Sequence, residues 1–196
     1  MPLKPLEDYE KLAERAHGHL CAGQILGIRM ALYGLRLLGI DDPEGTQRKR
    51  LITFVEIDRC AMDAISVVTG CRSGKRTMKF VDFGKTAATF CDLQRHKAVR
   101  VCARESSREL ADRMHPDVPD RNTRQVLAYR ELPDSDLFHP QWVRVSLLPE
   151  DLPGHHAPRV VCSKCGEGVA FGREVIRDGA ACCRACAGDS YYEPLG

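Results

Sequence analysis

Apolar residues recur at helical spacing in two segments near the start of the chain. Between residues 5 and 16 the apolar side chains return every three or four positions, with charged residues between them. Between residues 24 and 38 the apolar stripe consists of Ile25, Ile28, Leu32 and Leu35, and Gly39 follows it. The spacing predicts two amphipathic helices, the second ended by that glycine and the two joined by the loop HGHLCAG.

Short runs of β-branched residues follow and alternate irregularly with further helical patterns. LITFVEI, residues 51–57, predicts a buried strand, and Asp58 predicts the N-cap of a helix over 59–69 that Gly70 ends. Further strands are expected at 78–83, 88–93, 99–103 and 142–148, and further helices at 106–114, where Ser-Ser-Arg-Glu suggests a capping box, and at 122–129. Because no regular strand–helix–strand rhythm is present, the pattern favours an α+β fold with a mixed β-sheet flanked by helices.

A proline-rich segment divides the chain. PEDLPGHHAP, residues 149–158, contains three prolines and reads as a linker. The sequence therefore predicts a core domain at 1–150, a linker at 151–158 and a small C-terminal domain at 159–196. The composition, 43% apolar and 29% charged over 196 residues, is that of a globular protein with room for one sizeable core.

Charge and hydropathy exclude several classes of partner. A net charge of +2 favours neither nucleic acid nor an anionic membrane, and no apolar run approaches the roughly 20 residues of a spanning helix. The N-terminus lacks the apolar segment of a signal peptide, so a cytoplasmic location is expected. In that reducing compartment the ten cysteines favour metal ligation or redox chemistry over a disulfide framework.

Four C-terminal cysteines form two pairs with the spacing of a zinc site. Cys162 and Cys165 are followed, after seventeen residues, by Cys183 and Cys186. Two pairs with this spacing can surround one zinc ion with four thiolates in a tetrahedron. No coordination position is then left open, so a structural zinc is predicted. Cys182 could replace Cys183, but the two-residue spacing favours Cys183. Asp178-Gly179 predicts a hairpin turn between the pairs.

A second group of metal-binding side chains lies in the loop between the first two helices. His17, His19 and Cys21 combine imidazoles with a thiol, which suits zinc. Cys21 and Cys60 both stand at predicted helix starts, where the helix dipole favours a thiolate. Asp63, one turn after Cys60, could serve as an acceptor for a ligand or as a base. Taken singly, each of these residues also fits an ordinary structural role.

The sequence resembles the FmdE family, which is named for a component of formylmethanofuran dehydrogenase. HGHLCAGQILGIRMA and VEIDRCAMDAISVVTGCRSGK are similar to its paired signature, and CSKCGE with DGAACCRAC is similar to the zinc finger that many members append. The resemblance implies a core that is thioredoxin-like in outline, a treble-clef finger at 159–196, and a metal cleft formed by His17, His19, Cys21 and Cys60. Ala22 departs from the family, which commonly has proline there.

The resemblance also implies a function. The expected role is that of a metal-binding accessory protein or subunit of a molybdenum or tungsten formylmethanofuran dehydrogenase-type oxidoreductase, in anaerobic one-carbon metabolism. Cys21, Cys60 and Asp63 would be its reactive residues, with a second metal, zinc, in the cleft, and family analogy suggests a homodimer. Two alternatives remain: a zinc-finger adaptor that binds a protein, with nucleic acid disfavoured, and a thiol oxidoreductase that pairs Cys21 with Cys60 or Cys71.

Overall fold

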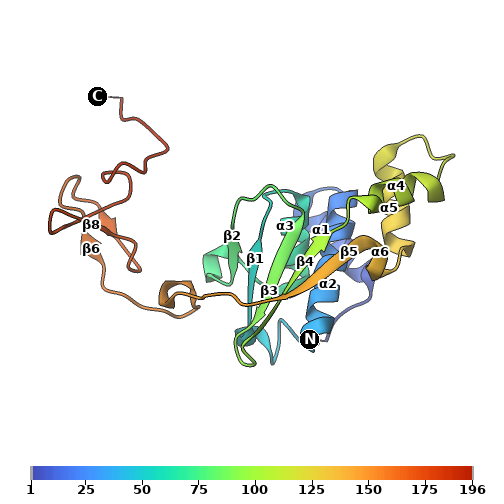
Figure 1. Cartoon of the computed structure of the whole chain (residues 1–196), viewed down its shortest axis with the longest axis horizontal. Helices are drawn as coiled ribbons and strands as arrows, with labels where there is room; N and C mark the ends of the chain where they lie inside the picture. Colours follow the sequence, from blue (N-terminus) through green and yellow to red (C-terminus); the bar gives the residue numbers. More distant parts are fainter. Residues whose placement is uncertain (1, 196) are drawn as a thin grey trace. The chain divides into compact units, whose positions relative to one another are not determined.

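The computed structural model describes residues 2–195, which separate into two compact units, 2–146 and 147–195 (Figure 1). The first unit holds a five-stranded mixed sheet in the order β2-β1-β3-β4-β5. Its strands are β1 (Leu51–Val55), β2 (Met78–Phe80), β3 (Ala87–Asp92), β4 (Lys97–Ala103) and β5 (Phe138–Val143). Only the β1–β2 pair is parallel, and the other three pairs are antiparallel. The prediction of an α+β fold with a mixed sheet is confirmed.

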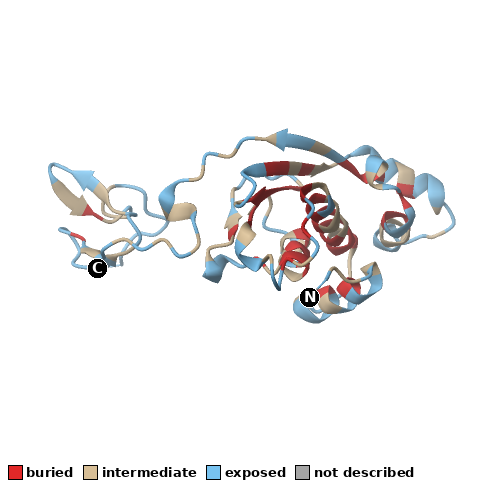
Figure 2. Cartoon of the chain, turned by 90° about the horizontal axis from the view of Figure 1, so that it is seen from below, coloured by how far each residue is buried: buried red, intermediate tan, exposed pale blue. Residues whose placement is uncertain are grey.

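The helices of the first unit lie on one side of the sheet or beyond its end, as Figure 2 shows. They are α1 (Leu6–His17), α2 (Ala22–Leu38), α3 (Cys60–Thr69), α4 (Ser106–Met114), α5 (Arg121–Glu131) and α6 (Asp134–Leu137). The main core lies between them and the sheet, where side chains such as Ile25, Ile28, Phe90 and Val99 are fully buried. Ile52, Cys91 and Ala98 form a second, smaller cluster on the other face.

Close packing of α2 against α3 depends on a glycine. A Cβ atom at Gly27 would lie 2.6 Å from the carbonyl oxygen of Ala61 and 2.8 Å from the Cβ of Ala64. Only a residue without a side chain therefore allows the two helices to approach this closely. The contact fixes the start of α3 relative to the second turn of α2.

The edge strand β5 corrects one sequence prediction. A strand was expected at 142–148, whereas β5 spans Phe138–Val143 and pairs with β4 from Ala103↔Phe138 to Ala98↔Val143. Pro140 lies inside this strand, which β5 tolerates because an edge strand has one side without a hydrogen-bonding neighbour. The short helix α6, immediately before it, was not predicted.

Two predicted helix caps are also wrong. The N-cap of α3 is Arg59 instead of Asp58, and no side chain caps this helix. The N-cap of α4 is Glu105, already in helical conformation, and the Ser107 hydroxyl donates to the Arg104 carbonyl instead of closing a capping box. In α5, by contrast, Asp120 is a true N-cap, accepting the backbone N–H of Thr123 at 2.7 Å.

The second unit contains two short hairpins and very little buried surface. Its strands are β6 (Val160–Val161), β7 (Gly168–Val169), β8 (Val175–Arg177) and β9 (Ala180–Cys182). Asp178 and Gly179, both at positive φ, form the predicted turn between β8 and β9. Among its described residues only Cys162 and Cys182 are buried. This unit therefore has no apolar core of its own. No described helix is long and apolar enough to cross a bilayer.

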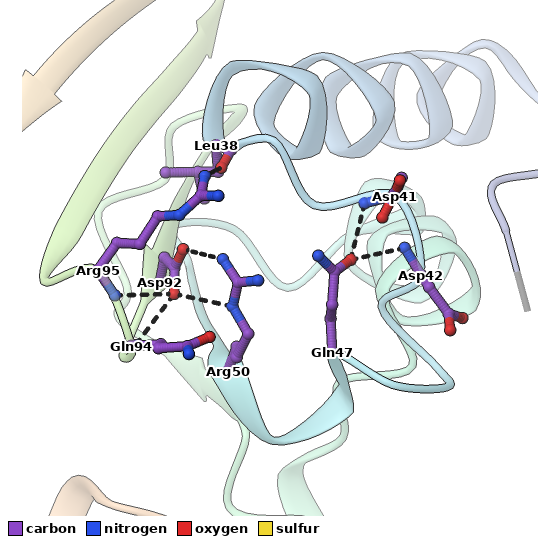
Figure 3. A network of polar contacts seen from close by, with 8 residues as sticks. All are labelled: Leu38, Asp41, Asp42, Gln47, Arg50, Asp92, Gln94 and Arg95. Carbon is purple, nitrogen blue, oxygen red and sulfur yellow. Dashed lines mark hydrogen bonds and ion pairs between the residues drawn. The ribbon is translucent and has the colours of Figure 1, made fainter.

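A buried carboxylate anchors the end of β3 (Figure 3). Asp92, 1% exposed, accepts hydrogen bonds from the Arg50 guanidinium and from the backbone N–H groups of Gln94 and Arg95. Burial raises the pKa of Asp92, but these hydrogen bonds outweigh it and hold the pKa below its usual value. The ion pair joins β1 and β3 at the hairpin end of the sheet.

We expect Asp92→Asn to destabilise the protein by about 3 kcal/mol at neutral pH, because the variant leaves the partly buried Arg50 without its counter-charge. A depressed carboxyl pKa contributes stability above the unfolded pKa of about 3.9 and loses it as pH falls through the folded value. The stability difference between the parent and the variant should therefore narrow below about pH 4.

Urea unfolding from pH 3 to pH 7 measures this difference. The exposed Asp82→Asn is the control and should follow the parent at every pH. A gap between Asp92→Asn and the parent that stays constant down to pH 3 would contradict the role given to the carboxylate.

Candidate metal centres

The C-terminal cysteines converge on one point. One ligand atom from each of Cys162, Cys165, Cys183 and Cys186 lies within 4.8 Å of the others, and the sulfurs of Cys165 and Cys183 are 3.9 Å apart. Four thiolates around zinc at about 2.3 Å would be separated by about 3.8 Å, so the spacing fits the ion. Gly166, at φ +76°, turns the chain directly after the first pair.

Backbone hydrogen bonds favour the ionised form of Cys162, whereas the neighbouring thiols raise the pKa of Cys165 and raise that of Cys186 to about 12. Hydrogen bonds from the backbone N–H groups of Cys165, Cys183 and Lys164 lower the pKa of Cys162 to about 6. The backbone N–H of Cys186 also points at the Cys183 sulfur, at 3.4 Å. Because zinc binds thiolates and not thiols, the hydrogen bonds to Cys162 prepare that ligand for the metal.

Cys182 does not belong to this cluster. Its side chain is 1% exposed, and its sulfur lies 3.3 Å from the Ser163 hydroxyl. It packs beneath the site as a small buried residue, whereas Cys183 lies in the group of four.

A second group of possible ligands lies where α1 meets α2. His17 is the last residue of α1, Gly18 ends that helix at φ +93°, and Cys21 is the N-cap of α2. One ligand atom from each of His17, His19 and Cys21 lies within 4.8 Å of the others. Three donors from one short corner of the chain can thus reach a single ion.

Asp63 orients one of these histidines. Nδ1 of His17 lies 2.8 Å from the carboxylate of Asp63, in the first turn of α3. The hydrogen bond occupies Nδ1 and leaves Nε2 as the donor atom for a metal. A carboxylate behind a ligating histidine is the usual arrangement at zinc sites.

Cys60 lies beside this group without being part of it. It is the first residue of α3, and its thiol interacts with the thiol of Cys21. Burial raises the pKa of Cys60, and the neighbouring Cys21 raises it further. The helix dipole therefore does not by itself stabilise the thiolate that was expected at this helix start. A Cβ at Gly23 would lie 3.3 Å from the Cβ of Cys60 and 3.8 Å from the Cys21 sulfur, so glycine keeps this space open.

The remaining core cysteines lie away from this corner. Cys71 follows the far end of α3, about 15 Å along the helix from Cys60. It is 3% exposed, and burial raises its pKa. Burial raises the pKa of Cys91 on β3 to about 12. These positions disfavour Cys71 as a redox partner of Cys21.

Two hollows adjoin Cys60, and sequence reasoning identified only one of them. The first includes His17, Asp58 and Asp63, and the second includes Arg108, Asn122 and Gln125. The last three residues come from α4 and α5, more than forty positions after Cys60. Their spacing in the sequence carries no signal that could place them here.

We expect Cys165→Ser to lose one zinc ion per chain and to unfold the C-terminal unit, because only two of the residues described in that unit are buried and could form a core. Near-complete loss of zinc from this unit, with the far-UV signal of the core retained, is the predicted outcome. Zinc analysis and proton NMR measure the two effects.

The matched control is Cys182→Ser, one position before a ligand. It should keep its zinc content, since its sulfur lies outside the group of four. Equal zinc loss in both variants would show that the ligand assignment is wrong.

Comparisons with known proteins match each of the two units. Residues 16–139 match the family described as FmdE, molybdenum formylmethanofuran dehydrogenase operon, and residues 157–192 match the prokaryotic dksA/traR C4-type zinc finger. The finger match and the four-cysteine cluster together support a structural zinc at Cys162, Cys165, Cys183 and Cys186.

Two relatives cover nearly the whole chain. An FmdE-like protein from Syntrophus aciditrophicus, named after tungsten formylmethanofuran dehydrogenase, has a similar fold, with a TM-score of 0.64 and 22% identity over 96% of this chain and 95% of that one. A probable S-adenosyl-L-methionine-binding protein from Archaeoglobus fulgidus is 29% identical over 94% of this chain. The chain spans about half of that curated relative, 53% of its length. The match over residues 16–139 establishes that this chain belongs to the FmdE family.

Proposed function

We propose that this protein is a metal-binding accessory subunit of a molybdenum or tungsten formylmethanofuran dehydrogenase-type oxidoreductase, with a second zinc ion in its core. The observation that carries the proposal is the convergence of His17, His19 and Cys21 within 4.8 Å. Two imidazoles and a thiolate are donors that zinc prefers, and Cys60 lies close enough to the Cys21 thiol to provide or to vacate a fourth position.

The side chains around this site fit a metal better than they fit a purely structural role. The His17–Asp63 bond is formed at 2.8 Å, although the Asp63 side chain is 57% exposed. In such an exposed position the bond contributes little to stability, but it fixes the tautomer of the imidazole. A Cβ atom at Gly23 would contact both sulfurs and press on the Cβ of Cys60 at 3.3 Å, so a side chain there would fill the space beside the thiols.

In this proposal each side chain has a distinct task. Bound zinc would supply Lewis-acid chemistry, or hold the thiols as redox ligands. His17, His19 and Cys21 would hold the ion, and Asp63 would position His17. The raised pKa of Cys60 keeps a proton on its sulfur, and a neighbouring cation would reverse that preference.

The association with an oxidoreductase rests on family membership. The family takes its description from the operon of molybdenum formylmethanofuran dehydrogenase, and the solved relative is described as an FmdE-like protein of the tungsten enzyme. We place the protein in the cytoplasm of an anaerobe, in one-carbon metabolism, and expect a homodimer.

A zinc-finger adaptor is the second candidate, favoured by apolar residues exposed on the C-terminal unit. Val161 and Ile176 are each 65% exposed, and Tyr191 is 97% exposed. Exposed apolar and aromatic side chains suit a protein partner. The charges of residues 159–196 are balanced, five basic against five acidic, which gives no surface for a nucleic-acid backbone.

Metal analysis of a Cys21→Ala/Cys60→Ala double variant tests the core site. The parent should contain two zinc ions per chain and the variant one, because the C-terminal ligands are untouched. Cys91→Ala is the matched control, since Cys91 is a buried thiol on β3 outside both groups, and it should keep two. A double variant that holds as much zinc as the parent would falsify the core site.

Affinity purification from the native host tests the proposed partner. The tagged chain should enrich molybdenum or tungsten oxidoreductase subunits at least tenfold over a tagged unrelated protein. If residues 1–146 alone give the same enrichment, the first unit makes the contact with the oxidoreductase subunits. Enrichment that needs residues 147–196, with partners other than oxidoreductase subunits, would favour the adaptor instead.

A further inference from the structure

A hollow beside Cys21 and Cys60 has the volume of a small ligand site. It measures about 320 Å³, at the lower end of the roughly 300–1,000 Å³ of known small-molecule pockets. Its walls come from the starts of α2 and α3, from Thr86 before β3, from Arg108 on α4 and from the first turns of α5. The two thiols lie in its wall, so a molecule bound there would reach the proposed metal centre.

The charged side chains that line this hollow are all positive. Among its thirteen lining residues two are arginines, Arg59 and Arg108, and none is acidic. Arg108 has an ion pair with Glu105 at 3.3 Å, but both side chains are more than half exposed, 51% and 83%. A pair so exposed to solvent is weak, and Arg108 can exchange it for a ligand.

The neutral polar groups of the hollow supply hydrogen-bond donors. The side-chain oxygen of Asn122 accepts the backbone N–H of Ala22 at 3.0 Å, which leaves the amide NH₂ of Asn122 as a donor. Gln125 lies one turn further along α5 and can donate in the same way. With two guanidinium groups and two amides, the hollow offers donors that match the oxygens of an anion.

The adjoining hollow has the opposite character. It measures about 360 Å³ and contains the carboxylates of Asp58 and Asp63 beside His17. Arg59 and Cys60 line both hollows and form the boundary between them. An anion is therefore attracted to one side of Cys60 and repelled from the other, so a bound molecule has a single favoured orientation.

We propose that the hollow lined by Arg59, Arg108, Asn122 and Gln125 binds a small organic carboxylate, with its carboxylate toward Arg108 and its other end toward Cys21 and Cys60. The planar guanidinium fork matches a carboxylate, and the apolar walls provided by Leu26, Ile57 and Ala61 suit a short carbon chain. This inference rests on the proposed function, because it gives the substrate class of the same site.

Calorimetric titration of the zinc-loaded full chain tests the proposal. The probes are acetate, malonate, succinate and glutarate, with malonamide and succinamide as uncharged controls of matched length. We expect at least one carboxylate to bind and the amides to fail. Arg108→Gln should weaken that binding about tenfold, the effect of losing one charged hydrogen-bonded pair.

Arg113→Gln is the matched control. Arg113 is an exposed arginine on the same helix and lines neither hollow, so its loss changes the net charge equally. Carboxylate affinity should be unchanged in this variant, and the zinc content should be unchanged in both.

Three results would overturn the proposal: no carboxylate binding at millimolar concentration, amides that bind as tightly as the acids, or equal weakening by the two arginine variants. Failure of the core metal site has a different signature, because the parent would then hold one zinc per chain. Calorimetric titration of a parent protein with one zinc per chain would still show whether the hollow binds a carboxylate.

Discussion

The approach of α2 to α3 is the contact on which the core site depends. Cys21 and Cys60 are 39 positions apart in the sequence, yet each stands at the start of one of these helices. With Gly27 against the backbone of Ala61, the two starts are held side by side. The site is therefore a product of helix packing, and the loop that carries the histidines completes it.

The strongest periodic patterns predicted the fold most accurately. The stripes of α1, α2 and α3 are long, and a glycine ends each of these helices in the left-handed conformation, so their C-terminal ends could be anticipated within one or two residues. The edge strand could not be anticipated, because Pro140 normally argues against a strand and only its place at the sheet edge makes it acceptable. The predicted N-caps of α3 and α4 were wrong because no side chain accepts a hydrogen bond from the backbone at the start of either helix.

The sequence predicted the C-terminal ligands completely and those of the candidate core site only in part. The difference depends on whether the ligands are neighbours in the sequence or are brought together by the fold. Ligands that share a turn, such as Cys162 and Cys165, are close in space whatever the rest of the chain does. The same holds for His17 and Cys21. Cys60 needs the tertiary fold, and Arg108 needs two further helices, so no local spacing could bring them to the site.

The scarcity of buried side chains in the C-terminal unit ties its folding to the supply of zinc. Only two of its described residues are buried, both cysteines, so the free energy that orders this unit depends on the logarithm of the free metal concentration. The sheet and its helices have an apolar interior of their own, so their folding does not need the metal. When free zinc falls, the finger is therefore expected to unfold while the sheet and its helices stay folded.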